Sequence, residues 1–479
     1  MRDGGRISAA IEVLAQIEQR HLTVRRALKA WGDDARYAGA KDRAFVSGLV
    51  LDGLRMRRSL AAAMGEETDR ARVLAALRFG WGWSPERIAE AAEDPHGPGA
   101  LTEVERARLI PPPMGEGDHA KHGGGGLAAT PASGAKPTHH LSAGEGPLGR
   151  SATAPPIGEQ LSAPVRGDYP DWLDDALARA FGDSRAAECA ALAERAPVDL
   201  RVNTLKTEMD RALKALGPMG AEPVEVLKHG LRIAAPAAAD RAVAIEVAPE
   251  FAKGWFEVQD LGSQIAASAA GDIKGRQVLD FCAGGGGKTL ALAAAMANKG
   301  QLYAYDSDAR RLTDTVTRSQ RAGVRNLQIR SPIRPGALDG LDEKMDLVFV
   351  DAPCTGSGTW RRHPDAKWRL TAAQLEKRMG EQDAVLASAA SFVKPGGRIV
   401  YVTCSLLMEE NEDRIAAFLA AHPDFAQVSA LDAIAASGLA KEAGLAALAE
   451  RQSSAGALRL TPLTFGTDGF FVAVLERRP

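Results

Sequence analysis

Two patterns of apolar residues divide the chain into an N-terminal helical part and a C-terminal α/β part. Between residues 7 and 92 the apolar positions recur at helical spacing, as in Ile11, Leu14 and Ile17. From residue 262 onward, short β-branched runs alternate with helical stretches. Such alternation is typical of a doubly wound parallel sheet, so the pattern predicts an α/β protein with an all-helical N-terminal region.

The C-terminal part is predicted in some detail. Strands are expected at 277–283, 301–306, 326–331, 346–353, 398–405, 458–463 and 469–477, and helices at 288–297, 309–323, 372–393 and 411–422. The last two strands follow one another with no helix between them, which favours an antiparallel hairpin at the edge of the sheet.

Two further segments separate these parts. Residues 111–166 are rich in Gly, Pro, Ala and Ser and almost lack large apolar side chains, so they are predicted to form a flexible linker. Four of the nine histidines lie there, but no rigid frame would fix them around a metal ion, and no metal is expected. A small mixed α/β piece follows. The predicted domains are therefore 1–110, the linker, 167–254 and 255–479.

Composition narrows the class of protein. The chain has 45% hydrophobic and 25% charged residues, as soluble globular proteins do, and it contains no apolar run of membrane-spanning length. Glu12 and Glu18 interrupt the N-terminal pattern, which argues against a signal peptide. The four cysteines form no CxxC pair, so neither a zinc site nor a disulfide framework is expected. This use of cysteine predicts that the protein works in a reducing cytoplasm.

Charge is unevenly distributed along the chain. The net charge is only −2, but residues 309–334 hold seven arginines and a single acid, and the first sixty residues are also basic. A charge run is often only a solvated face. Because these patches are basic, however, the low net charge does not exclude a nucleic-acid partner.

The most distinctive stretch runs from residue 345 to residue 405. Two apolar strands each deliver a cysteine at the C-terminal end: Cys354 follows Asp351 and Pro353, and Cys404 lies between Thr403 and Ser405. Ligands bind beyond the carboxyl ends of parallel strands, so both thiols are expected in one crevice. Either cysteine alone could be a small buried hydrophobic residue. Two thiols and a carboxylate together favour covalent chemistry on an electrophilic carbon.

A glycine-rich loop at 280–289 joins the first strand of the α/β part to its first helix. Glycines let the backbone approach a ligand closely, and the helix N-terminus offers free N–H groups. A phosphate-binding P-loop would need glycine where Cys282 stands. Nicotinamide and S-adenosylmethionine sites both place an acid on the ribose about 20 residues later, and Asp306 fits either cofactor.

Together with the paired cysteines, this loop resembles that of the RsmB/Nop family of RNA cytosine-C5 methyltransferases. The matching motifs occur in family order over residues 165–479: VQDLGSQ (258–264), DFCAGGGGK (280–288), DAPCTGSG (351–358), RRHPDAKW (361–368), TCS (403–405), EEN (409–411) and DGFFVA (468–473). The segment KDRAFVSGLV (41–50) resembles the NusB-like RNA-binding domain of bacterial small-subunit rRNA members.

The resemblance implies a class I S-adenosylmethionine-dependent fold with a seven-stranded, mostly parallel sheet, and it implies an RNA-recognition role for residues 167–254. It makes Cys404 the nucleophile that adds to C6 of cytosine, Asp351 the group at N3, and Cys354 an aid to product release. Sequence alone does not order the two thiols, because DNA cytosine methyltransferases place their nucleophile in a Pro-Cys dipeptide like that at 353–354.

The residues expected to hold S-adenosylmethionine are Cys282, Ala283, Gly284, Gly285, Gly286, Gly287, Lys288, Asp306, Arg311, Ser331 and Asp351. Two of them depart from the family pattern. Gly285 replaces the usual proline, and Ser331 or its neighbours stand where an acid is expected near the adenine. Weaker cofactor binding than in relatives follows from this second departure. A monomer is expected.

Four basic residues in the RRHPDAKW motif or directly after it are predicted to hold RNA phosphates: Arg361, Arg362, Lys367 and Arg369. Trp368 lies among them, with either a part in this RNA contact or a packing role. Small-subunit rRNA is the expected substrate. A tRNA substrate, a catalytically idle RNA-binding assembly factor and a P-loop NTPase are the alternatives.

Overall fold

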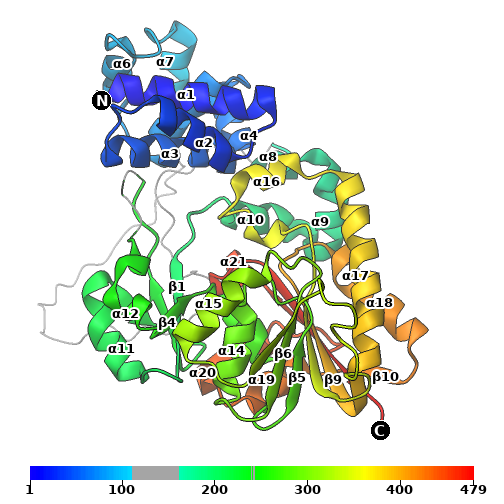
Figure 1. Cartoon of the computed structure of the whole chain (residues 1–479). Coiled ribbons are helices and arrows are strands. Elements are labelled where there is room, and N and C mark those ends of the chain that lie inside the picture. The colour runs from blue at the N-terminus through cyan, green and yellow to red at the C-terminus, as the bar shows by residue number, and fades with distance from the viewer. Residues whose placement is uncertain (111–160, 239, 241–242) are drawn as a thin grey trace, which may run out of the picture.

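The computed structural model describes residues 1–110, 161–238, 240 and 243–479, and Figure 1 shows their arrangement. The linker predicted for 111–166 therefore lies mostly outside the described residues. Its last four residues, Ala163–Arg166, form the short helix α8, in which Ala163 and Pro164 are buried.

The N-terminal region is helical, as predicted. Its helices are α1 (Asp3–Arg20), α2 (Val24–Asp34), α3 (Ala40–Arg55), α4 (Arg57–Met64), α5 (Asp69–Ala75), α6 (Pro85–Glu93) and α7 (Glu103–Leu109). The periodic apolar residues face one core, in which Ile7, Leu14 and Leu49 are fully buried. Thr68, Ser84 and Thr102 accept backbone hydrogen bonds at the starts of α5, α6 and α7, which fixes where these helices begin.

A small antiparallel sheet follows, with the strand order β2–β3–β1–β4. Its strands are β1 (Val198–Val202), β2 (Ala221–Pro223), β3 (Gly230–Ile233) and β4 (Phe256–Val258). Leu200 and Val202 of β1 pack in one core with Ala212 of α11 (Met209–Leu216). Side chains alternate along a strand, so Asp199 and Arg201 point to the opposite face, toward α13 (Leu261–Ser268).

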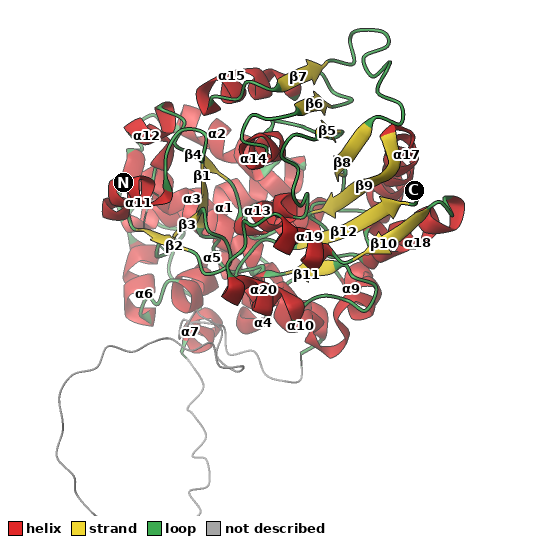
Figure 2. Cartoon of the chain, turned by 90° about the horizontal axis from the view of Figure 1, so that it is seen from below, coloured by secondary structure: helices red, strands yellow, loops and turns green. Residues whose placement is uncertain are grey.

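The large sheet has the order β10–β12–β9–β8–β5–β6–β7, which Figure 2 shows from below, and β11 pairs with β12 beside this path. Its strands are β5 (Gln277–Asp280), β6 (Gln301–Tyr305), β7 (Leu327–Arg330), β8 (Met345–Asp351), β9 (Val393–Thr403), β10 (Phe425–Val428), β11 (Leu458–Leu460) and β12 (Phe470–Arg477). The pairs from β7 to β9 are parallel, whereas β12 runs antiparallel to its neighbours. This is the predicted class I methyltransferase fold, except that the described sheet has eight strands and not seven, because β11 adds to β12.

The prediction of a terminal edge hairpin was wrong in two respects, because the short helix α21 (Pro462–Phe465) separates the two strands and the pair does not form the edge. The strands β11 and β12 do pair antiparallel, but β12 lies between β9 and β10 rather than at the edge. The reason is β10, a short strand that the apolar pattern did not reveal and that adds to the sheet outside β12.

Helices cover both faces of the large sheet. Leu347 and Phe349 of β8 pack in one core with α13, α14 (Gly287–Ala295) and α19 (Ala430–Ala436). Val348 and Val350 pack in the other core with α17 (Ala372–Phe392) and α18 (Glu412–Ala421). Burial on both faces explains why the parallel strands read as continuous apolar runs.

The helical region sits over α16 (Pro364–Arg369), which contacts α3 (Figure 1). Lys367 donates a hydrogen bond to the Arg55 carbonyl at 3.0 Å, and Trp368 donates one to the Leu54 carbonyl at 2.7 Å. Arg55 in turn donates to the Arg361 carbonyl at 3.0 and 3.1 Å. Trp368 therefore has the packing role.

For Arg361 and Lys367, this placement contradicts the prediction that they hold RNA phosphates, whereas for Arg362 and Arg369 that role stays a prediction. The Lys367 side chain is buried, and Arg361 is paired with Asp260 and Asp468 in the interior. Arg362, partly buried, is paired with the same two carboxylates at 2.9 and 2.7 Å. Arg369 is the most exposed of the four, and it pairs with Asp365 one helical turn earlier.

The burial of Arg361 generates a stability prediction. Replacing Arg361 with Gln leaves Asp260 and Asp468 in a buried site with one guanidinium between them, so we expect a loss of ~3–5 kcal/mol in the free energy of unfolding. Thermal unfolding followed by circular dichroism measures the effect. The control, Arg106→Gln, removes an ion pair with Glu93 in which both side chains are about half exposed, and it should change stability by less than ~0.5 kcal/mol. Equal, small effects of the two substitutions would contradict the structural role of Arg361.

Candidate active site

The structure brings the two strand-end cysteines together, as predicted. The Sγ atoms of Cys354 and Cys404 are 3.4 Å apart. The strands β8 and β9 are parallel neighbours, and the pairing places Asp351 opposite Val402. Beyond the last pair, the Ala352 amide donates to the Val402 carbonyl at 2.8 Å and the Gly358 amide donates to the Cys404 carbonyl at 2.9 Å. The loop after β8 is therefore tied to β9 on both sides of Cys354.

A buried carboxylate holds the two cysteine-bearing turns. Glu410, fully buried, accepts hydrogen bonds from the Thr355 amide at 2.8 Å and from Gln382 Nε2 at 3.0 Å. It also accepts the hydroxyl protons of Thr355 and Ser405, the residues next to the two cysteines in sequence. Glu410 belongs to the EEN motif, but the sequence alone assigned it no role.

The two thiols differ in their surroundings. The hydrogen bond to Cys404, burial, and the negative charges of Cys404 and Glu410 raise the pKa of Cys354 well above its usual value. Cys354 therefore stays protonated at neutral pH and can donate its proton toward the Cys404 sulfur. The two sulfurs lie close enough to share one proton, and either of them can be its donor.

A lysine–aspartate pair lies next to the thiols. Lys288 Nζ is 2.7 Å from Asp351 Oδ2, and the Asp351 side chain remains 34% exposed. Burial would lower the pKa of Lys288, but the charge of Asp351 and their hydrogen bond outweigh it and raise this pKa. The pair thus holds a proton beside a carboxylate that a ligand can reach.

The glycine-rich loop leaves an open surface above the end of β5. Gly284 has φ +50°, and a Cβ built on it would have no heavy atom within 4 Å. At Gly286, with φ +83°, a Cβ would collide with Thr315. The Gly284 amide donates to Asp306 Oδ2 at 2.9 Å, while Oδ1 accepts from the Asp308 amide at 2.8 Å. Asp306 thus anchors the loop and, since each carboxylate oxygen has a second lone pair, can still accept from a ligand.

Asp280 was not predicted as a site residue. Its Oδ2 accepts a hydrogen bond from Thr289 Oγ1 at 2.6 Å, whereas its Oδ1 has no hydrogen-bond partner among the described residues. Complete burial, reinforced by the charges of Asp351 and Asp306, raises the pKa of Asp280 to about 7. Its position as the first residue of the DFCAGGGGK motif was the available signal.

The remaining predicted cofactor residues are less directly engaged. Cys282 borders the loop, and burial raises its pKa well above the usual value, so it is not a reactive thiolate. Arg311 is exposed at the start of α15 (Leu312–Ala322), and Ser331 is half-buried directly after β7. Gly285 accepts a hydrogen bond at its carbonyl from Arg318. Within the described residues, no group of three or more His, Cys, Asp or Glu side chains is arranged to bind a metal ion.

Known proteins resemble this chain in both of its α/β parts. A family model described as "16S rRNA methyltransferase RsmB/F" matches residues 272–476, and a model of the RsmF/B ferredoxin-like domain matches residues 169–240. Two solved structures have similar folds. The protein PH0851 has a TM-score of 0.65 with 23% identity, and the match covers 100% of this chain and 99% of the PH0851 chain. A methyltransferase homologue from Pyrococcus horikoshii has a TM-score of 0.52 with 28% identity, and the match covers 66% of this chain and 97% of the homologue.

Curated relatives have similar sequences. A probable ribosomal RNA small subunit methyltransferase B from Synechocystis is 31% identical over 324 residues, which are 67% of this chain and 69% of the relative. Ribosomal RNA small subunit methyltransferase B from Yersinia pseudotuberculosis is 33% identical over 293 residues, which are 58% of this chain and 65% of the relative. Because the Synechocystis protein shares more than 30% identity over two thirds of both chains, this protein belongs to the RsmB/F family of methyltransferases.

Proposed function

We propose that this protein is an S-adenosylmethionine-dependent RNA cytosine-C5 methyltransferase that modifies small-subunit rRNA through a covalent bond between Cys404 and C6. The observation that carries the proposal is the 3.4 Å approach of the Cys354 and Cys404 sulfurs beside the Lys288–Asp351 pair. The names of the relatives, which are small subunit rRNA methyltransferases, support the choice of substrate.

The chemistry requires a nucleophile and a proton source. C5 of cytosine is too poor a nucleophile to accept a methyl group directly, but addition of the Cys404 thiolate to C6 makes C5 enamine-like. The proton held between Lys288 and Asp351 stabilises the charge that develops at N3 when the C6–S bond forms. When bound, S-adenosylmethionine supplies the electrophilic methyl group. After methylation, C5 loses its proton to water, the electron pair re-forms the C5–C6 double bond as the C6–S bond breaks, and Cys354 donates its proton to the departing Cys404 sulfur.

The residues around the glycine loop fit this cofactor. The space above Gly284 admits a ligand close to the backbone, and Asp306 retains lone pairs for ribose hydroxyls. The loop residues Cys282 to Lys288, with Asp306 and Asp351, would hold it, while Arg311 and Ser331 would contribute from the edge. Thr289 donates its hydroxyl proton to Asp280 in the interior, so it is not placed to bind a metal–phosphate group as in a P-loop.

The target cytosine must be unstacked, because C6 cannot be reached within a helix. A tRNA substrate would meet the same requirement and remains the second candidate. The pairing of two thiols with a reachable carboxylate argues against an idle assembly factor, which would need none of these groups.

Cysteine substitutions test the proposal directly. We expect Cys404→Ala to abolish methyl transfer and adduct formation, lowering kcat by at least ~10³-fold. Cys354→Ala should still form the adduct but release it slowly, so protein-linked RNA accumulates. Denaturing gel electrophoresis with labelled rRNA and S-adenosylmethionine detects the linked species, and bisulfite sequencing detects the product. Cys189→Ala, in a separate core, is the control. Full activity with alanine at both positions 354 and 404 would refute the mechanism.

The raised pKa of Asp280 predicts a pH-dependent stability. Between pH 4 and 7 the folded state binds a proton that the unfolded state has lost, so this group's contribution to stability falls as the pH rises through that window. The Asp280→Asn variant has no charge to bury. Its stability relative to wild type should therefore increase from pH 5 to pH 8 by about 2–4 kcal/mol. Thermal unfolding without cofactor at a series of pH values measures this difference, and parallel curves would contradict it.

Ser331 stands where the family pattern expects an acid. If the missing carboxylate weakens cofactor binding, then Ser331→Asp should tighten S-adenosylmethionine binding about tenfold, the effect of one added charge-assisted hydrogen bond. Isothermal titration calorimetry measures the Kd. Ser331→Asn, which has the same shape without the charge, is the control, and an unchanged Kd for Ser331→Asp would contradict this explanation.

A further inference from the structure

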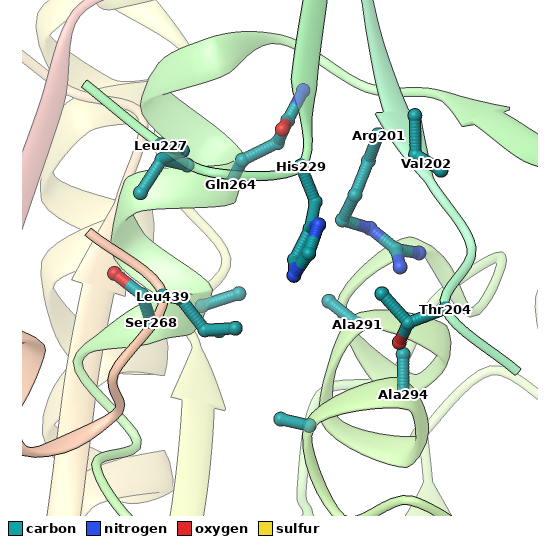
Figure 3. Close-up of a pocket in the computed structure, with 12 residues that line it drawn as sticks. Arg201, Val202, Thr204, Leu227, His229, Gln264, Ser268, Ala291, Ala294 and Leu439 are labelled. Atoms are coloured by element: carbon teal, nitrogen blue, oxygen red, sulfur yellow. The ribbon is translucent and has the colours of Figure 1, made fainter. Parts of the chain in front are cut away.

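A cavity lies outside the active site, between the small antiparallel sheet and the helices α13 and α14. Its volume is about 60 Å³, and it opens to solvent beside Thr204, which is exposed. Arg201 and His229 line one side, and Ala291 and Ala294 of α14 line another (Figure 3). None of the residues that line it is acidic.

Arg201 is the most unusual of these residues. Its guanidinium is buried, with 8% of the residue exposed, and its Nε donates to Gln259 Oε1 at 2.7 Å. Its Nη2 has no hydrogen-bond partner among the described residues. Burial lowers the pKa of Arg201 to about 10, so the side chain is still charged at neutral pH. A buried, charged donor without a partner is costly and requires an explanation.

His229 presents a second unsatisfied group beside the first. Its Nδ1 is buried and has no partner within the described part of the chain. Burial, followed by the charges of Lys228 and Arg201, lowers the pKa of His229, so the ring is neutral and can donate one proton. Figure 3 shows the imidazole and the Arg201 guanidinium side by side over the cavity, with Thr204 on the Arg201 side.

The charge around Arg201 is not balanced by nearby acids. Its cross-strand neighbour Glu257 is bound by Arg318 at 2.9 Å and by Arg321 at 2.5 Å. One carboxylate thus faces three guanidinium groups. The remaining walls are alanine, leucine and valine side chains together with the uncharged Gln264 and Ser268, and none of these supplies a counter-charge.

The geometry points to a phosphate-binding site in this cavity, in which Arg201, His229 and Thr204 donate to the phosphate oxygens. Guanidinium groups match the geometry of phosphate oxygens. A single water occupies about 10–15 Å³ on this volume scale, so the space suits a group of about four to six heavy atoms, and phosphate has five. A phosphate of an RNA backbone and free inorganic phosphate share this chemistry. The site is separate from the thiols and does not depend on the proposed methyl transfer.

Inorganic phosphate added to the full-length protein tests the site. We expect a saturable rise in Tm with phosphate, relative to sodium chloride of equal ionic strength, and a heat of binding by calorimetry. Arg201→Met should weaken phosphate binding at least tenfold, whereas Arg325→Met, which removes an exposed arginine that does not line the cavity, should not. Ala294→Leu, which fills the cavity and keeps Arg201, should also abolish binding, and it covers the case in which Arg201→Met does not fold.

Two results would overturn the inference. One is the absence of a saturable phosphate effect in wild type, which would mean that the cavity holds only water. The other is an effect of equal size in the folded Arg201→Met or Ala294→Leu variant. Competition then separates the two sources of phosphate. The site holds an RNA phosphate if saturating inorganic phosphate weakens the binding of single-stranded RNA by the wild type but not by Ala294→Leu. The site holds the free ion if saturating phosphate leaves RNA binding by the wild type unchanged.

Discussion

The parallel pairing of β8 with β9 is the constraint on which the active site depends. Six residue pairs set the register, and both strands are buried on both faces, so neither can slip without moving apolar side chains out of two cores. Asp351 ends β8 opposite Val402, and Cys404 follows two residues later. Because backbone hydrogen bonds continue past the ends of the strands, the positions of Asp351, Cys354 and Cys404 are inherited from the sheet itself.

Buried charge has two different outcomes in this molecule. Arg361 and Arg362 face Asp260 and Asp468, so two cations meet two anions, and this balanced group ties the segment before α16 to the start of α13 and to the turn before β12. Around Glu257, three guanidinium groups share one carboxylate, and Arg201 is left with an unsatisfied nitrogen. The first group is complete without a ligand. The second has spare positive charge next to a cavity, which is the condition for binding an anion.

The sequence was most informative where structure follows from local pattern. Runs of residues buried on both faces identified β5, β8 and β9, and the rule that parallel strands end at one edge was enough to bring Cys354 and Cys404 together. The short β10 and the insertion of β12 were missed, because strand order depends on contacts between distant segments. Arg361 and Lys367 looked like a surface patch for the same reason, since Asp260, Asp468 and the Arg55 carbonyl lie about 100 to 300 residues away. Burial of Asp280 depends on the loop above it, which no local pattern encodes.

The charges beneath the glycine loop bear on which ligand it can hold. Three carboxylates, from Asp280, Asp306 and Asp351, surround the loop, and Lys288 is the cation paired with one of them. Their mutual repulsion adds to burial in raising the pKa of Asp280. A triphosphate would bring further negative charge to this place and increase the repulsion, whereas a sulfonium cation would reduce it and favour the ionised form of Asp280. In a P-loop protein, a loop of similar glycine content faces a metal ion in addition to its lysine. The electrostatics of the buried acids, rather than the glycines, therefore favour a cationic cofactor over a nucleotide triphosphate.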